Sequence, residues 1–292
     1  MYFKSRTGSV YWYEIHGEGP PVALLHGFTG SVRTWDTFIH QWQNSCRFII
    51  IDLPGHGKTD APQKTMEDCC RDIKELLDGL SLDNIHLVGY SMGGRTALSF
   101  AMLYPDDVHA LVLESASPGL IAKKERMDRQ HKDAKLIQML EQKGLKRFVD
   151  YWEKIPLFES QNHLPDNVQQ SIRGIRLSHG KEGLISSLQY MGTGVQPSWW
   201  DRLSTFDKPV FLLAGEYDEK YISINSAMQQ KFVHSDFSVV KNAGHAIHVE
   251  QSVIFGKLVV EYILNNVCNM DKDIRRNEVD SKLEECKRIS RN

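Results

Sequence analysis

The sequence predicts an α/β fold with a mostly parallel sheet, flanked by helices and interrupted by a helical lid insertion. Short apolar runs alternate with segments of helical spacing over residues 8–117, and the alternation returns after residue 205. This rhythm breaks at Pro118, and residues 121–195 show helical spacing and no strand pattern. Because strands that alternate with helices form parallel sheets with helical crossovers, one interrupted α/β core accounts for both observations.

The composition of the chain argues against several classes of partner. Its 292 residues carry a formal net charge of −2, with 25% charged and 41% apolar residues, as in ordinary globular domains. This charge gives no electrostatic reason to bind nucleic acid or an anionic membrane. The longest apolar runs have four or five residues, whereas a membrane-spanning helix needs about 20. We therefore expect no nucleic-acid partner and no membrane span.

The N-terminus and the cysteines indicate a compartment. No uninterrupted apolar stretch precedes a small-residue cleavage site, so the sequence shows no secretory signal. The cysteines form no C-x-x-C pair and have no metal-ligand spacing; they are Cys46, Cys69, Cys70, Cys268 and Cys286. A low and odd number of cysteines is typical of free thiols in a reducing environment. We expect a cytoplasmic protein without a metal site.

Five apolar runs in the first part of the chain predict strands, over residues 10–15, 22–25, 48–52, 85–89 and 108–114. Apolar residues at helical spacing predict a helix over residues 65–80. A run of small and apolar residues predicts a second helix over 93–103, which ends before Pro105. These strands and helices form the first part of the predicted core.

The second part of the chain predicts the insertion and the end of the core. Residues 121–195 are rich in Lys, Arg, Gln and Glu, and strand patterns return at 210–214 and 237–240, before a helix over 249–267. We assign residues 1–117 and 205–270 to the core and 118–204 to a helical lid. Residues 271–292 are highly charged and predict a solvated tail, with a short amphipathic helix as the alternative.

The motif Gly89-Tyr-Ser-Met-Gly93 predicts a nucleophile on a sharp turn. It matches G-x-S-x-G between a predicted strand and a predicted helix, which is the context that this motif requires. Glycine permits the close approach of backbone to backbone in such a turn. We expect Ser91 to stand at the carboxyl end of the sheet, with the Met92 backbone N–H pointing at the reacting centre.

An acid and a histidine follow this serine in the chain order of hydrolase triads. Asp218 comes directly after the strand 210–214, and His245 comes after the strand 237–240. Both therefore belong to the same rim of the sheet as Ser91, where the acid would orient the imidazole and the imidazole would activate the serine. Glu114, at the end of a strand, and Glu216 remain alternative acids.

The remaining histidines near these motifs have mainly structural interpretations. His26 and Phe28 follow the strand 22–25, where the Phe28 N–H would be the second oxyanion donor. We expect His26 to hold this loop by hydrogen bonds rather than to transfer protons. The turn Asp52-Leu-Pro-Gly-His-Gly57 indicates a structural role for His56, and His86 and His248 are expected to pack.

Together these motifs resemble the α/β-hydrolase superfamily. His26-Gly27, Asp52-Leu-Pro-Gly-His-Gly57, Gly89-Tyr-Ser-Met-Gly93, Asp218 and Gly244-His245 stand in the order of that superfamily over residues 8–117 and 205–267. The resemblance implies an α/β-hydrolase fold. Superfamily membership alone does not fix the reaction, and the simplest expectation for such a triad is ester hydrolysis.

The arginines argue for a different substrate. Arg95 lies one helical turn after Ser91, and the lid carries Arg126, Arg129, Arg147, Arg173 and Arg176. Several guanidinium groups around a pocket suit a substrate with several carboxylates, and they are an odd lining for a neutral ester. Solvated helix faces are the alternative interpretation for most of the lid arginines.

Five longer motifs resemble the 2-succinyl-6-hydroxy-2,4-cyclohexadiene-1-carboxylate (SHCHC) synthase family of menaquinone (vitamin K2) biosynthesis. They are Gly89-Tyr-Ser-Met-Gly-Gly-Arg95, Glu114-Ser-Ala-Ser-Pro-Gly-Leu120, Tyr151-Trp-Glu-Lys-Ile-Pro-Leu-Phe158, Met191-Gly-Thr-Gly-Val-Gln-Pro197 and Gly215-Glu-Tyr-Asp-Glu-Lys220. The resemblance implies a lyase that removes a ring proton and eliminates pyruvate from 2-succinyl-5-enolpyruvyl-6-hydroxy-3-cyclohexene-1-carboxylate. The alternatives are a serine hydrolase of a small carboxylate-bearing ester or carbon–carbon-bonded dicarbonyl, and a non-catalytic module, although the latter would lack a triad residue.

The resemblance also implies the residues that contact the substrate. Arg95, Arg129 and Arg176 match the cations for three carboxylates, and the neighbouring contacts are Tyr90, Trp152 and His26. Arg126 and Arg173 stay open as substitutes, because each lies three residues from the matched position. The resemblance implies no cofactor and no metal, and the sequence leaves open whether the protein is a monomer or a homo-oligomer.

Overall fold

The computed structural model describes residues 1–267, and the expected tail over 271–292 lies outside the described residues. One eight-stranded sheet has the strand order β1-β2-β4-β3-β5-β6-β7-β8. Strands β3 to β8 run parallel, and β1 and β2 are antiparallel additions at one edge. The strands are β1 Tyr2–Lys4, β2 Val10–His16, β3 Pro21–Leu25, β4 Arg47–Ile51, β5 Ile85–Tyr90, β6 Val108–Glu114, β7 Val210–Gly215 and β8 Ser235–Val240. The predicted mostly parallel α/β sheet is confirmed.

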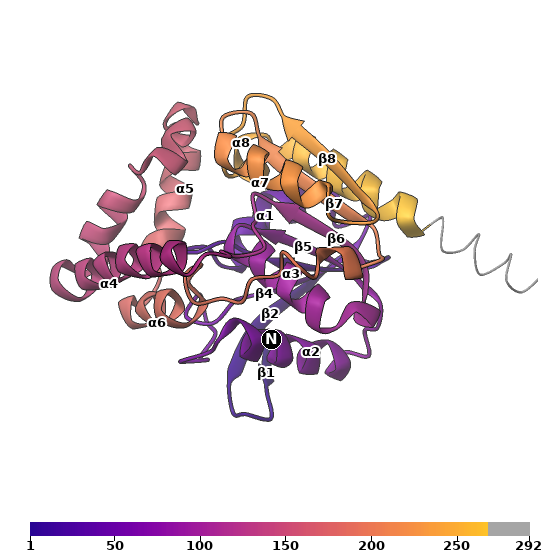
Figure 1. Cartoon of the computed structure of the whole chain (residues 1–292), viewed down its shortest axis with the longest axis horizontal. Helices are drawn as coiled ribbons and strands as arrows, with labels where there is room; N and C mark the ends of the chain where they lie inside the picture. Colours follow the sequence, from indigo (N-terminus) through magenta and orange to yellow (C-terminus); the bar gives the residue numbers. More distant parts are fainter. Residues whose placement is uncertain (268–292) are drawn as a thin grey trace, which may run out of the picture.

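Helices cover both faces of the sheet (Figure 1). Successive strand residues point to opposite faces, so Val22 and Leu24 pack on one side while Ala23 and Leu25 pack on the other. Helices α2 (Met66–Gly79), α3 (Met92–Leu103) and α7 (Glu219–Gln229) share one core. Helix α1 (Asp36–Trp42) and the helical residues 252–267 share the other. The two cores fix the strand ends that carry the site.

Two short elements were not expected from the sequence. Strand β1 has three residues, and α1 has seven and follows the 3-10 turn η1 (Val32–Trp35). Neither element is long enough to give a clear hydrophobic period. The helix expected over 249–267 is divided, because α8 covers Ile247–Glu250 and the long helix starts at residue 252.

The insertion is helical, as predicted, and lies beside the sheet as a separate group of helices (Figure 1). It contains α4 (Lys123–Trp152), the 3-10 helix η3 (Pro156–His163), α5 (Asp166–Leu177) and α6 (Lys181–Met191). Gly144 interrupts α4 with a φ of 76°, a left-handed conformation that favours glycine. Leu140, Phe148 and Leu184 pack in a small core of the insertion itself. We call residues 118–204 the lid.

The topology brings distant segments to one rim of the sheet. The residues that follow β3, β5, β7 and β8 all leave the sheet at the carboxyl ends of parallel strands. Ligands of open α/β sheets bind at this rim. Within residues 1–267, no helix combines the length and the apolar character that crossing a membrane requires.

Candidate active site

Ser91 stands on a tight turn between β5 and α3. Its φ of 51° is unusual for a residue with a side chain, and its backbone N–H donates to the Glu114 carbonyl at 2.8 Å. The turn depends on glycine, since a Cβ at Gly89 would lie 2.4 Å from the Gly93 carbonyl oxygen. A Cβ at Gly93 would lie 2.0 Å from the Leu25 carbonyl oxygen. Backbone contacts of this kind admit no side chain, so they hold Ser91 at the rim.

The structure brings Ser91, His245 and Asp218 into one hydrogen-bonded relay. His245 Nε2 lies 3.0 Å from Ser91 Oγ, and His245 Nδ1 lies 2.6 Å from Asp218 Oδ2. The imidazole is almost completely buried, as is the Asp218 carboxylate. Because a carboxylate accepts hydrogen bonds, Nδ1 donates to Asp218 and Nε2 is left to accept the Ser91 proton. The three residues have the geometry of an activated serine.

The alternative acids are engaged elsewhere. Glu114 is fully buried and accepts hydrogen bonds from the His248 backbone N–H at 3.0 Å and from His248 Nδ1 at 2.9 Å. Glu216 accepts from the Asn242 backbone N–H at 2.9 Å. His86 is buried inside β5 against the His109 ring, where burial lowers the pKa of His86 to about 3. Neither acid contacts His245, and His86 and His248 pack as structural residues.

Two backbone amides are available beside Ser91. Met92 is the first residue of α3, where helical N–H groups have no intrahelical acceptor. Phe28 lies on the loop after β3 and shares the wall of the same cavity with Met92. Within residues 1–267 neither amide donates to a protein acceptor. Phe28, Met92 and Ser91 therefore line one cavity, and both backbone amides are free to donate there.

His26 holds the loop that carries Phe28. Its Nε2 accepts the Leu53 backbone N–H at 3.0 Å, so its Nδ1 carries the proton and donates to the Gly27 carbonyl at 2.8 Å. Burial lowers the pKa of His26 to about 3, which keeps the ring neutral. Both ring nitrogens thus bind backbone groups, and His26 is not among the residues that line the cavity containing Ser91.

Ser91 opens into a cavity of about 490 Å³ between the sheet and the lid, which we call the main cavity. Arg95 lines it, and its guanidinium donates to the Met191 carbonyl at 2.9 Å and to the Gln196 side chain. Arg95 is only 8% exposed, and burial lowers its pKa to about 10. Among the described residues no carboxylate pairs with it. A buried cation without a counter-ion indicates a place for an anion.

The other arginines of the lid divide into two groups. Arg129 lines the main cavity, and its Nε lies 2.9 Å from Asp133 Oδ1, so part of its charge is already paired. Arg173 donates to Asp150 and Glu153 at 2.5 and 2.6 Å and does not line the main cavity. Arg126 donates to the Val195 carbonyl at 3.2 Å and does not line the cavity either. Of these three arginines, only Arg129 lines the main cavity, which favours Arg129 over Arg126 as a residue that contacts a ligand there.

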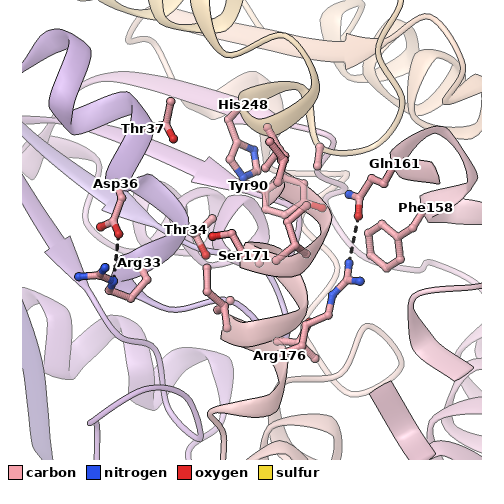
Figure 2. A pocket seen from close by; sticks show the side chains of 18 of the residues that line it. Arg33, Thr34, Asp36, Thr37, Tyr90, Phe158, Gln161, Ser171, Arg176 and His248 are labelled. Atoms are coloured by element: carbon pink, nitrogen blue, oxygen red, sulfur yellow. Dashed lines mark hydrogen bonds and ion pairs between the residues drawn. The ribbon is translucent and has the colours of Figure 1, made fainter. Parts of the chain in front are cut away.

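Arg176 lies in a second cavity of about 230 Å³ (Figure 2), which we call the side cavity. Tyr90 and Phe158 line both cavities and form part of the wall between them. The Arg176 guanidinium lies 4.8 Å from the centre of the Phe158 ring and donates to the Gln161 side chain at 3.2 Å. The family resemblance assigns Arg95 and Arg176 to carboxylates of one substrate, and the structure places the two arginines in different cavities on either side of this wall.

Trp152 and Tyr90 both line the main cavity. The Trp152 indole N–H has no acceptor within the described part of the chain, although the atom is buried. The Tyr90 ring packs 4.5 Å from the His248 ring and 5.3 Å from the His245 ring. The indole is an unused donor next to the serine, whereas Tyr90 separates the two cavities.

Lys220 lines the main cavity and was not expected as a site residue. It lies in the first turn of α7, two residues after Asp218. Partial desolvation in the cavity, followed by the Arg129 guanidinium, lowers the pKa of Lys220, although the residue as a whole is exposed to solvent. Within residues 1–267 no carboxylate forms an ion pair with it. The sequence could have indicated this position, because Lys220 lies two residues after Asp218, which follows β7 at the rim of the sheet.

Comparisons with known proteins agree with this geometry. The family model of the α/β-hydrolase fold matches residues 20–252. A Bacillus subtilis (strain 168) protein, provisionally named 2-succinyl-6-hydroxy-2,4-cyclohexadiene-1-carboxylate synthase, is 46% identical over 259 residues, which cover 86% of this chain and 94% of that protein. The synthase of that name from Salmonella paratyphi B is 31% identical over 79% of this chain and 88% of its own length.

A solved structure gives the same assignment. The structure of MenH from S. aureus matches with a TM-score of 0.84 and 33% identity, over 87% of this chain and 98% of that one. The match extends over most of both chains, and the identity with the Bacillus subtilis protein is well above the level at which only a fold is shared. The chain therefore belongs to the α/β-hydrolase superfamily and, within it, to the 2-succinyl-6-hydroxy-2,4-cyclohexadiene-1-carboxylate synthase family.

Proposed function

We propose that this protein is a carbon–oxygen lyase of menaquinone biosynthesis. It converts 2-succinyl-5-enolpyruvyl-6-hydroxy-3-cyclohexene-1-carboxylate into 2-succinyl-6-hydroxy-2,4-cyclohexadiene-1-carboxylate and pyruvate. The observation that carries the proposal is the combination of a Ser91–His245 hydrogen bond of 3.0 Å with buried Arg95 in the same cavity, where no described carboxylate forms an ion pair with its guanidinium. An activated base beside an unpaired cation suits a substrate with several carboxylates. Membership of the synthase family supports the same reaction.

Ser91 is the base in this proposal, and His245 activates it. As His245 Nε2 takes the Ser91 hydroxyl proton, the serine oxygen removes the ring proton of the substrate. The electron pair of that C–H bond, at C2, forms a double bond to C3, the original C3=C4 double bond shifts to C4=C5, and the bond from C5 to the enolpyruvyl oxygen breaks. The imidazolium then returns a proton to the leaving group, which departs as pyruvate. Asp218 stabilises the imidazolium through the 2.6 Å contact at Nδ1, and no acyl-enzyme forms.

The Phe28 and Met92 amides stabilise the charge that develops during proton removal. The succinyl carbonyl is conjugated to the breaking C–H bond, so negative charge accumulates on its oxygen. Two N–H donors that are already oriented towards this oxygen lower the energy of the transition state more than that of the bound substrate. Their lack of protein acceptors among the described residues supports this role.

Four cations are proposed to bind the carboxylates. Arg95, Arg129 and Lys220 act in the main cavity, and Arg176 acts across the Tyr90–Phe158 wall. Binding at both places requires the Tyr90 and Phe158 side chains to move apart, so that one arm of the substrate reaches the side cavity. Trp152 supplies its unused indole N–H to a carboxylate oxygen. The three acids of the main cavity, Glu125, Asp128 and Asp133, lie on the lid at α4.

The reaction is tested by a pyruvate-release assay on the enolpyruvyl substrate. We expect one pyruvate for each cyclohexadiene product and slow turnover of p-nitrophenyl esters. Ser91, His245 and Asp218 have the geometry of an ester-hydrolysing triad as well, so hydrolysis is the competing outcome. Efficient ester turnover without pyruvate would replace the lyase by a hydrolase.

We also propose the division of the chain and its setting. Residues 1–117 and 205–270 act as the catalytic core, and 118–204 act as a lid that closes over the main cavity. The free, buried thiols of Cys46, Cys69 and Cys70 support a reducing compartment, the cytoplasm. Fractionation of cells and limited proteolysis at the lid boundaries test these two assignments.

A further inference from the structure

We propose that His179, a lid residue, is a positioning residue for the oxyanion loop, defined as Gly27–Gly30. In this proposal the docked lid holds the Phe28 amide in place, so the oxyanion hole is complete only while the lid is seated. The inference rests on the proposed function, because it assigns the Phe28 amide to the transition state. It concerns a contact between two segments 150 residues apart in the chain.

Two hydrogen bonds fix both the position and the protonation of His179. Its Nδ1 accepts the Gly57 backbone N–H at 3.2 Å, so Nδ1 carries no proton. Its Nε2 therefore carries the proton and donates to the Thr29 carbonyl at 3.0 Å. The side chain is only 6% exposed, which shields both bonds from water. One lid imidazole thus joins two core loops, and one of them is the oxyanion loop.

A second imidazole holds the other side of Thr29. The Thr29 backbone N–H donates to His56 Nε2 at 3.1 Å, and the proton on His56 Nδ1 is donated to the Pro54 carbonyl at 3.0 Å. The Thr29 amide belongs to the peptide unit that begins at Phe28, and the Thr29 carbonyl belongs to the next unit. Both peptide units after Phe28 are therefore held by imidazoles, one from the core and one from the lid.

The backbone at Thr29 needs this support. Its φ is 65°, a left-handed conformation that is unfavourable for a residue branched at Cβ. Such a conformation persists only where neighbouring groups enforce it. Removal of the His179 donor would leave the Thr29 carbonyl without a partner in a buried position, so the loop would relax and carry the Phe28 amide with it.

The lid packs closely beside this bond. A Cβ added at Gly55 would lie 2.2 Å from the Gly183 carbonyl oxygen, so core and lid backbones are in direct contact there. The Phe28 ring packs 5.4 Å from the Trp152 ring of the lid and 5.5 Å from the His56 ring of the core. Lid and oxyanion loop therefore meet through His179, through the Phe28 ring and through the glycine pair. Movement of the lid changes all three contacts together.

His179→Phe tests the role of the two hydrogen bonds, since phenylalanine keeps a ring of similar size. The matched control is Ser186→Ala. Ser186 is another lid residue, and its hydroxyl accepts a hydrogen bond from the backbone N–H of Gln63 in the core at 3.0 Å. For each variant we measure kcat and KM for pyruvate release and the deuterium isotope effect with substrate labelled at the abstracted ring position. Thermal melting shows whether each variant is folded.

We expect His179→Phe to lower kcat by about 10-fold or more, since complete loss of one oxyanion donor costs about 10²–10³ in kcat. KM should stay within about threefold and the isotope effect should rise, because a misplaced donor makes proton removal slower. Ser186→Ala should match the wild type in kcat, in KM and in the deuterium isotope effect. Near-native kcat and isotope effect in His179→Phe, or an equal loss in Ser186→Ala, would overturn the proposal.

Two further arms keep the test decisive. If His179→Phe does not fold, His179→Ala is assayed with and without added imidazole. Rescue of kcat by imidazole supports the positioning role of His179. A native kcat without imidazole, or a low kcat that imidazole does not raise, contradicts that role. If the wild type releases no pyruvate, the proposed reaction fails by itself. The same variants are then compared on a p-nitrophenyl ester, whose hydrolysis needs the same oxyanion donors.

Discussion

Arg95 and Arg176 face two different cavities, on opposite sides of a wall that contains Tyr90 and Phe158. Arg95 and Arg176 are 8% and 7% exposed as residues, and neither forms an ion pair with a carboxylate within residues 1–267. Burial lowers the pKa of each, most clearly that of Arg95. Burial of two such charges costs solvation free energy, and ion pairs with the carboxylates of a bound polycarboxylate offset that cost.

Arg95→Gln should raise KM by about 10- to 100-fold, because a charge-assisted hydrogen bond to a carboxylate is worth about 1.5–3 kcal/mol. The kcat should change less, since the same carboxylate is bound in the substrate and in the transition state. Steady-state kinetics of pyruvate release measure both. Arg173→Gln is the control, because Arg173 is paired with Asp150 and Glu153 outside the main cavity. An unchanged KM in Arg95→Gln would contradict the assignment.

Arg176→Gln should also raise KM by about 10-fold or more if the substrate reaches the side cavity. Combination with Arg95→Gln then gives nearly additive losses, because the two arginines contact different carboxylates and share no hydrogen-bond partner. The double-mutant cycle is measured as kcat/KM. If Arg176→Gln leaves kcat/KM unchanged, the substrate is confined to the main cavity.

Lys220→Met should raise KM several-fold, which corresponds to a loss of about 1 kcal/mol of binding free energy. The effect is smaller than that of Arg95→Gln, since a solvent-accessible ammonium contributes less to carboxylate binding than a buried guanidinium. The variant removes the charge and keeps most of the aliphatic volume. Lys231→Met, just beyond the other end of α7, is the control with the same change at an exposed position. Equal KM values for the two variants would show that Lys220 does not bind substrate.

Ser91→Ala should lower kcat by about 10²–10⁴-fold with little change in KM, because the proposed base acts on the transition state. The control is Ser115→Ala at the end of the neighbouring strand β6. The Ser115 hydroxyl is buried and has no hydrogen-bond partner among the described residues, and its φ of 48° matches that of Ser91. Retention of kcat in Ser91→Ala would show that another group removes the proton.

The stability of the fold should fall as the pH decreases from 7 to 5. Burial lowers the pKa of His86 to about 3. Between pH 6.5 and 3 the His86 imidazole is therefore protonated in the unfolded chain and neutral in the folded chain. At pH 5 this difference costs about 2 kcal/mol of the free energy of unfolding. Removal of the imidazole in His86→Leu should therefore flatten the decline by that amount in denaturant titrations. His40→Leu, at an exposed histidine, should leave the slope unchanged.

Most of the parallel sheet could be predicted because its signals are local. Apolar runs such as those of β4 and β7 are buried on both faces, and they alternate with helices of clear period. Strand β1 and helix α1 could not be predicted, since three and seven residues give too little pattern and tertiary contacts hold them. The division of the last helix at residue 251 has no counterpart in the hydrophobic pattern of the sequence.

The sequence alone predicted that Ser91, Asp218 and His245 lie at one rim of the sheet, because each follows a recognisable strand and parallel strands end at one rim, and the structure joins the three by hydrogen bonds. Only the tertiary structure decided which cations share a cavity with the serine. It separated Arg176 from Arg95, paired Arg173 with acids of the lid, brought Lys220 to the main cavity, and joined His179 to the Thr29 carbonyl. The physical reason is that the relay residues follow strand ends, whereas cavities and lid contacts arise from side chains of segments far apart in the chain.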